Sequence, residues 1–163
     1  MQSVTDSLSL TYRAAPSSVG LARAAMVEFA GRAGATRAEI DAIRLATSEA
    51  VTNAVVHAYR GAPGQIHVTA TIAGPELWLL IADDGAGMEP EAHRPGLGLG
   101  LGLISRVCDE VRIVSRPSGG TEVGIRLGLA HVAQDSAPMA PGQLTVNAPA
   151  AGVAMVHAAP EPD

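Results

Sequence analysis

Apolar and polar residues alternate along the chain with two different periods, which predict strands and helices. Residues 7–12 alternate one by one, as expected of a strand with one buried face. From Pro16 the apolar positions recur at helical spacing, which predicts a helix that ends near glycines 31–34. Thr36, with Glu39 three residues later, is the pattern of a capping box and marks the start of a second helix.

The second predicted helix runs from about Arg37 to Tyr59 and stops at Gly61. Two β-rich stretches follow, residues 65–72 and 76–82. The Ala-Gly-Pro between them is typical of a hairpin turn. These stretches therefore predict two adjacent antiparallel strands.

After Asp83 the chain becomes rich in Gly, Pro and Glu, and a short helical pattern appears near residues 101–107. Two more strands, 111–115 and 121–129, form a second predicted hairpin. This order predicts an α/β (α+β) two-layer sandwich, with a mixed, largely antiparallel sheet and helices on one face. It lacks the βαβ alternation of a Rossmann domain.

The composition changes at about residue 131, which divides the chain into a domain of residues 1–130 and a tail of residues 131–163. The tail is rich in alanine and proline and contains neither arginine nor lysine. We expect it to be disordered, because it has little to bury. Residues 143–146 could still dock as an edge strand.

Charge and composition exclude several classes of protein. A net charge of −5 argues against a nucleic-acid-binding surface. The chain has no lysine, so the P-loop and the protein-kinase fold are excluded in their usual forms. With one cysteine, Cys108, it can form neither an internal disulfide nor a thiolate zinc site. The apolar run 77–82 is too short to span a membrane, and no secretory signal is visible, so we expect a cytoplasmic protein.

Three polar residues, Glu49, Asn53 and His57, follow one another at intervals of four within an otherwise apolar segment. On a helix this spacing puts them on one face. One interpretation is a solvated helix face. The other is a carboxylate base beside an amide oxygen that can bind a hard cation such as Mg²⁺.

Two glycine-rich segments lie downstream. In Asp83-Asp-Gly85-Ala-Gly87 a carboxylate at a strand end could accept a hydrogen bond from the amine of adenine, although Asp-Gly is also a common turn. Residues 96–103 alternate Gly and Leu at the start of a helix. There, free main-chain N–H groups could bind phosphate, or the glycines could serve only close packing.

Taken together, the motifs resemble those of the GHKL ATPase superfamily, which has the Bergerat ATP-binding fold. Glu49-x-x-x-Asn53 looks like its N-box, Asp83-x-Gly-x-Gly87 its first glycine box, and residues 98–101 its second. Gly120-Thr121 looks like its closing Gly-Thr signature. The segment around Glu49 is most similar to that of the anti-sigma-factor serine kinases.

This resemblance implies that ATP and Mg²⁺ are bound. Glu49 would be the catalytic base, Asn53 would bind Mg²⁺ at the ATP phosphates, and Asp83 would bind the adenine amine over Gly85 and Gly87. Other residues would surround the nucleotide. They are Gly98, Leu99, Gly100 and Leu101 at the phosphates, and Thr121 supporting Asp83. Arg94 could neutralise phosphate charge or be a solvated lid residue, and a structural role for His57 is favoured over a catalytic one.

The resemblance further implies an anti-sigma factor that sequesters a sigma factor and phosphorylates an anti-anti-sigma-factor protein on serine. It also implies a homodimer, with no direct contact to nucleic acid or membrane. Two alternatives stay open. One is an ATP-dependent switch that grips a protein partner without phosphorylating it, and the other is an α/β domain that binds no nucleotide.

Overall fold

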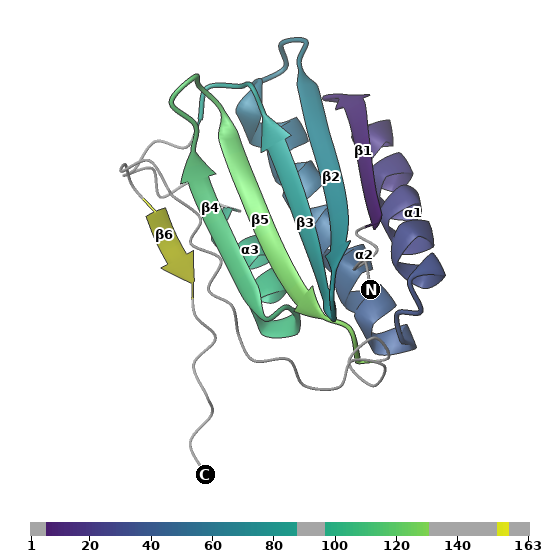
Figure 1. The fold of residues 1–163 in the computed structure, drawn as a ribbon. Helices are drawn as coiled ribbons and strands as arrows, with labels where there is room; N and C mark the ends of the chain where they lie inside the picture. The colour runs from purple at the N-terminus through teal and green to yellow at the C-terminus, as the bar shows by residue number, and fades with distance from the viewer. Residues whose placement is uncertain (1–5, 88–96, 131–152, 157–163) are drawn as a thin grey trace.

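The computed structural model describes residues 6–87, 97–130 and 153–156. Within them, one six-stranded sheet has the order β1-β2-β3-β5-β4-β6, and every pairing is antiparallel. Helices cover one of its faces (Figure 1). The predicted two-layer fold is confirmed, but the sheet is wholly antiparallel rather than mixed. The strands are β1 (Asp6–Arg13), β2 (Gln65–Ala73), β3 (Glu76–Asp83), β4 (Glu110–Ser115), β5 (Thr121–Gly128) and β6 (Val153–Val156).

The helical layer consists of α1 (Pro16–Arg32), α2 (Arg37–Asn53) and α3 (Leu97–Val107). The predicted capping box is present: the Glu39 main-chain N–H donates to the Thr36 hydroxyl (3.4 Å), and the Thr36 N–H donates to the Glu39 carboxylate (2.6 Å). These bonds satisfy two donors at the helix start that have no partner within the helix.

The helix predicted to reach Tyr59 changes character before it ends. The α-helical bonding of α2 stops at Asn53, and residues Ala54–Ala58 form a π-helical turn, η1. Because its bonds run from i to i+5, this turn is wider and shifts the side chains that follow. His57 therefore leaves the α-helical register that Glu49 and Asn53 share. The segment ends as expected at Gly61, whose φ is +86°.

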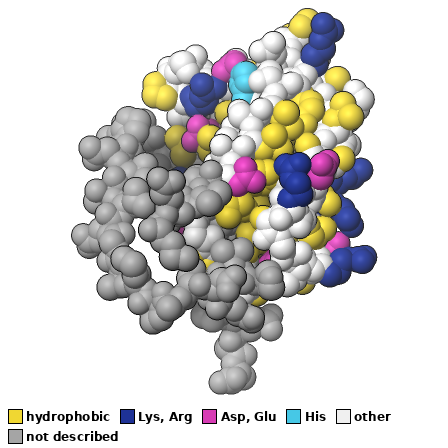
Figure 2. Space-filling model, turned by 45° about the vertical axis from the view of Figure 1, so that its right-hand side comes forward, with side chains coloured by type: hydrophobic (Ala, Val, Ile, Leu, Met, Phe, Trp, Pro, Cys, Tyr) yellow, Lys and Arg dark blue, Asp and Glu magenta, His cyan; other side chains and the backbone are white. Residues whose placement is uncertain are grey.

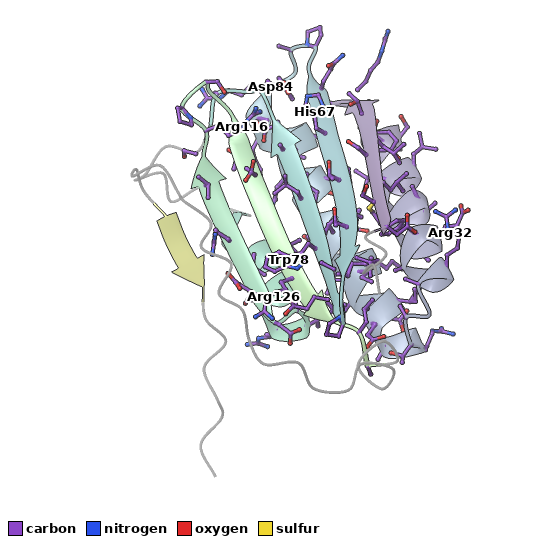
Figure 3. All side chains as sticks on the ribbon, viewed as in Figure 1. Arg32, His67, Trp78, Asp84, Arg116 and Arg126 are labelled. Atoms are coloured by element: carbon purple, nitrogen blue, oxygen red, sulfur yellow. The ribbon has the colours of Figure 1, made fainter. Side chains whose placement is uncertain are left out.

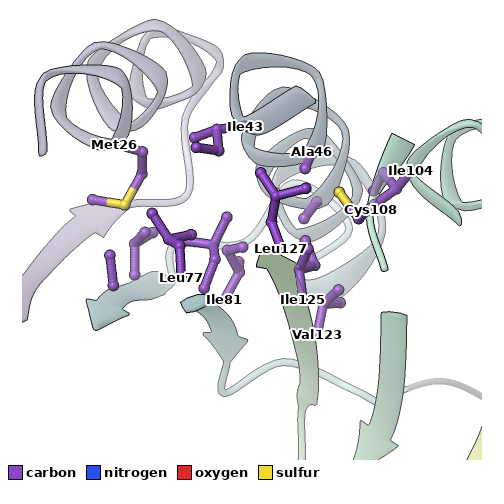
Figure 4. Packing of buried hydrophobic residues seen from close by; sticks show 14 of the residues in the cluster. Met26, Ile43, Ala46, Leu77, Ile81, Ile104, Cys108, Val123, Ile125 and Leu127 are labelled. Atoms are coloured by element: carbon purple, nitrogen blue, oxygen red, sulfur yellow. The ribbon is translucent and has the colours of Figure 1, made fainter. Parts of the chain in front are cut away.

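The core lies between the sheet and the helices (Figure 4). Strand residues at alternate positions, such as Val68 on β2 and Ile81 on β3, are fully or almost fully buried. Met26 of α1, Ile43 of α2 and Ile104 of α3 pack against them. Burial of apolar surface in one continuous cluster is therefore the main force that holds the two layers together.

No helix of the described residues covers the other face of the sheet, and apolar side chains lie there among charged ones (Figure 2). Trp78 on β3 is 43% exposed, and the guanidinium of Arg126 lies 5.9 Å from its ring centroid. Arg126 also pairs with Glu76 (2.8 Å) and Glu110 (3.2 Å). This charged and aromatic cluster joins β3, β5 and β4 at one end of the sheet.

The tail contributes one described strand. β6 pairs with β4 in the register Arg112↔Met155, so β4 is not the edge of the sheet. Residues 143–146, considered above for such an edge strand, lie outside the described residues. In the part of the chain that the structure describes, no helix has the length and apolar character needed to cross a membrane.

Candidate nucleotide site

Asp83 lies at the end of β3 and is 5% exposed. Its Oδ1 accepts hydrogen bonds from the main-chain N–H groups of Gly85 (3.0 Å) and Thr121 (3.2 Å). Within the described residues, Oδ2 accepts none. The carboxyl group is thus fixed by one oxygen, while the other can accept a hydrogen bond from a ligand.

Burial raises the pKa of the Asp83 carboxyl, and the neighbouring charge of Asp84 acts in the same direction. The bonds from Gly85 and Thr121 and the charge of Arg116 oppose this rise in pKa. A carboxylate that is desolvated yet incompletely bonded is costly to keep in the folded state. A donor that reached Oδ2 would reduce that cost.

The loop after Asp83 packs directly on the π turn. The N–H of Ala86 donates to the carbonyl oxygen of Ala58 (3.0 Å). A Cβ added at Gly85 would lie 2.2 Å from that same oxygen. Only glycine allows this close approach of two main chains. Gly85 therefore brings β3 and the end of the second helix together.

The turn between β4 and β5 also lies against Asp83. Gly120 has φ +91°, and a Cβ there would lie 1.9 Å from the carbonyl oxygen of Asp83. The next residue, Thr121, donates its main-chain N–H directly to the Asp83 carboxylate. The contact predicted between the two residues is thus a direct main-chain hydrogen bond in the structure.

Glu49 and Gly100 meet where α2 and α3 pack together. A Cβ added at Gly100 would lie 2.3 Å from Oε2 of Glu49. The absence of a side chain at position 100 thus leaves room for the carboxylate beside the first turns of α3. This places Glu49, the predicted base, next to the second glycine box at the start of α3, where the first main-chain N–H groups of a helix have no partner within it.

Asn53 has an unsatisfied side-chain donor within the described part of the chain. Its Nδ2 is buried and has no hydrogen-bond partner among the described residues. A buried amide without a partner is uncommon. The described residues contain no cluster of three or more His, Cys, Asp or Glu side chains able to hold a metal ion. The oxygen donors of Asn53 and Glu49 suit a hard cation that takes its remaining ligands from phosphate and water.

The other predicted site residues are placed as follows. Gly87, with φ +77°, lies against the main chain of Gly120. Gly98, Leu99 and Leu101 belong to the first turns of α3, whereas Arg94 lies outside the described residues. Within the described part of the chain, His57 makes no side-chain hydrogen bond, and its favoured structural role stays a prediction.

Four residues that form hydrogen bonds at the Asp83–Asp84 segment have no role in the sequence motifs described above. They are Tyr59, His67, Asp84 and Arg116. The second Asp of the Asp-Asp pair was the only visible signal. The others come from separate elements, so no spacing along the chain links them.

Known proteins similar to this chain point to a nucleotide-binding domain. Residues 12–127 match the family described as the histidine kinase-like ATPase domain. The anti-sigma F factor of Shouchella clausii is 30% identical over 76% of this chain and 92% of its own length. That of Clostridium acetobutylicum is 31% identical over 72% and 90%, respectively.

A solved structure agrees with these relatives. The crystal structure of the RsbU and RsbW domains of a Mycobacterium tuberculosis protein superposes with a TM-score of 0.62 at 28% identity. The match covers 76% of this chain but 32% of the mycobacterial chain. The chain therefore spans about a third of that longer protein.

Proposed function

The chain belongs to the histidine kinase-like ATPase family, and from this premise we propose that it is an anti-sigma factor with protein serine kinase activity. It would transfer the γ-phosphoryl group of ATP to a serine of an anti-anti-sigma-factor protein and would also sequester a sigma factor. The observation that carries the nucleotide site is the buried Asp83, with one oxygen bound to two N–H groups and the other available. The relatives named anti-sigma F factor support the choice of protein substrate.

Each site residue has one task in this scheme. Asp83 accepts a hydrogen bond from the adenine amine through Oδ2, and Gly85 and Gly87 allow the base to approach the main chain. Asn53 would hold Mg²⁺, which neutralises charge on the phosphates. Main-chain N–H groups at the start of α3 would bind phosphate oxygens.

Glu49 acts at the protein substrate. Its carboxylate accepts the proton of the serine hydroxyl as the serine oxygen forms a bond to the γ-phosphorus and the bond to ADP breaks. Phosphoryl transfer depends mainly on positioning and charge, so the distance of this carboxylate from the serine is decisive. Its place beside Gly100 supports this role. Arg94 is proposed to add positive charge near the phosphates.

The chain is proposed to act as a cytoplasmic homodimer without contact to nucleic acid. The test is a transfer assay with γ-labelled ATP, Mg²⁺ and a candidate anti-anti-sigma protein. Glu49→Ala should bind ATP but transfer no label, whereas Asp83→Asn should bind ATP about tenfold more weakly or worse. If the wild-type protein binds ATP and grips its partner but labels nothing, the non-catalytic switch is correct instead. Light scattering of the purified chain tests the dimer.

A further inference from the structure

Three side chains from separate elements, those of Tyr59, His67 and Arg116, bond to the Asp83–Asp84 segment. Figure 3 shows Arg116, Asp84 and His67 at the same end of the sheet, opposite the end that carries Trp78 and Arg126. Tyr59 follows η1, His67 lies on β2, and Arg116 immediately follows β4. Three parts of the fold thus meet at one peptide, directly beside the proposed adenine-binding carboxylate.

Every polar group of Asp84 except its main-chain carbonyl is bonded. Its N–H donates to the hydroxyl of Tyr59 (2.9 Å). Its Oδ1 lies 2.5 Å from Nη1 of Arg116, and its Oδ2 lies 3.2 Å from Nε2 of His67. The bond from His67, and then that from Arg116, hold the pKa of the Asp84 carboxyl below its usual range. Asp84 is therefore ionised at neutral pH and held from both sides.

Arg116 makes one further contact, which separates it from an ordinary surface ion pair. The same Nη1 donates to the main-chain carbonyl of Asp83 (3.1 Å). This guanidinium therefore bridges the carbonyl of the adenine-binding residue and the carboxylate of the next residue. Its own main chain is anchored by the bond from its N–H to the Gly120 carbonyl (3.0 Å).

The partners on the opposite side are themselves held in place. The Tyr59 hydroxyl also donates to the carbonyl of Gln65, and its ring covers Gly64, where a Cβ would lie 2.1 Å from a ring carbon. The Nδ1 of His67 lies 3.1 Å from the Thr11 hydroxyl. A neutral His67 that donates from Nε2 and accepts at Nδ1 satisfies both of its contacts.

We propose that Arg116, acting with Asp84, is a positioning residue for adenine recognition: it fixes the Asp83–Asp84 main chain so that Oδ2 of Asp83 is already oriented for the base. A side chain in a flexible loop would have to be ordered when ATP binds, and that ordering would weaken affinity. Because Arg116 and Asp84 already hold the peptide in place, its ordering takes place during folding and does not weaken ATP binding. The inference rests on the ATP binding of the proposed function and is independent of phosphoryl transfer.

The test compares Arg116→Ala with Arg112→Ala. Arg112 is a matched control, because it lies on β4, which directly precedes Arg116, and carries the same charge. Among the described residues it pairs only with Glu110. Calorimetric titration with Mg-ATP should show affinity reduced about tenfold in Arg116→Ala and within about twofold of wild type in Arg112→Ala. The melting temperature without nucleotide should barely change, because partly exposed ion pairs add little stability.

Two further measurements separate positioning from other roles. In Arg116→Ala, amide exchange should rise at Gly85 and Thr121, the donors to Asp83. Competition by inorganic triphosphate, which lacks the base, should be as strong as in wild type. Arg116→Lys should recover part of the ATP affinity, since an ammonium can still donate to both oxygens.

The possible failures are distinct. If wild-type protein binds no Mg-ATP, the nucleotide site itself is wrong. If wild type binds and Arg116→Ala binds equally well, only the positioning role is overturned. A parallel loss of triphosphate competition would also overturn it, because Arg116 would then act on phosphate by direct charge. Should Arg116→Ala not fold, Asp84→Asn provides the same comparison from the other side of the contact.

Discussion

Gly100 on α3 lies directly against the carboxylate of Glu49 on α2, with room for a hydrogen atom but none for a methyl group. A Cβ at position 100 would lie 2.3 Å from Oε2 of Glu49 and 3.3 Å from its Cδ. The atom in conflict is the end of a flexible side chain, so the fold can absorb the substitution. The proposed base would have to move.

Gly100→Ala should therefore reduce phosphoryl transfer at saturating ATP by about tenfold or more, since a displaced base is poorly oriented. Its thermal stability should not fall, because alanine favours a helix over glycine by about 1 kcal/mol. Gly102→Ala is the control, as a Cβ there meets nothing within 4 Å. Equal transfer rates for the two variants would contradict the role of Glu49.

Asp83→Asn should separate stability from binding. An asparagine oxygen can still accept from Gly85 and Thr121, and the variant no longer buries an ionisable carboxyl. We expect a free energy of unfolding at pH 7 equal to or above that of wild type, with ATP affinity reduced at least tenfold, because an NH₂ replaces the accepting Oδ2. Denaturant melts and ATP titration measure the two quantities. A strongly destabilised variant would show that the charge itself holds the loop.

The pH dependence follows from the raised pKa of Asp83. Because the folded state holds this proton more tightly than the unfolded state, the group's contribution to stability is fully present below the unfolded pKa of about 3.8. It is lost as pH rises through the higher folded pKa. ATP affinity should change oppositely and fall as Asp83 becomes protonated. Asp83→Asn should lack both effects. Thermal melts and ATP titrations between about pH 4 and about pH 7 would reveal the difference.

Gly120→Ala should destabilise the protein and weaken ATP binding together. Position 120 has φ +91°, and a Cβ would lie 1.9 Å from the main-chain carbonyl oxygen of Asp83, which cannot simply rotate away. The left-handed conformation alone costs roughly 1–2 kcal/mol for a residue with a Cβ. Gly31→Ala in α1, where a Cβ meets nothing within 4 Å, should instead stabilise. Chemical denaturation of both variants checks the contrast.

Cys108 should resist thiol reagents until the protein unfolds. Its side chain belongs to the core cluster, and burial, with a smaller effect from Asp109, raises its pKa to about 12. The reactive thiolate is then scarce at neutral pH. Labelling with a chromogenic disulfide should follow the unfolding transition in denaturant. Fast labelling in buffer would mean that α3 separates from the sheet without global unfolding.

The sequence determined most of the architecture, because its patterns are local. Alternating apolar residues in β2 and β3, and the Thr36–Glu39 capping box, record which face of each element is buried and where a helix begins. The spacing of Glu49 and Asn53 likewise follows from one helix alone. The matching family over residues 12–127 agrees with the ATP-binding fold that these motifs led us to expect.

Only the tertiary structure decided what surrounds Asp83. The π turn that presents the Ala58 carbonyl and the main-chain donor from Thr121 depend on elements packing together, as does the bridge made by Arg116. Those partners lie 25 to 38 residues away from Asp83 in the chain. A hydrogen bond between distant segments is fixed by how strands pair and turns close, and neither leaves a periodic signal in the sequence. The local sequence motif identifies the Asp83 carboxylate, and contacts from three segments distant in the chain determine its orientation.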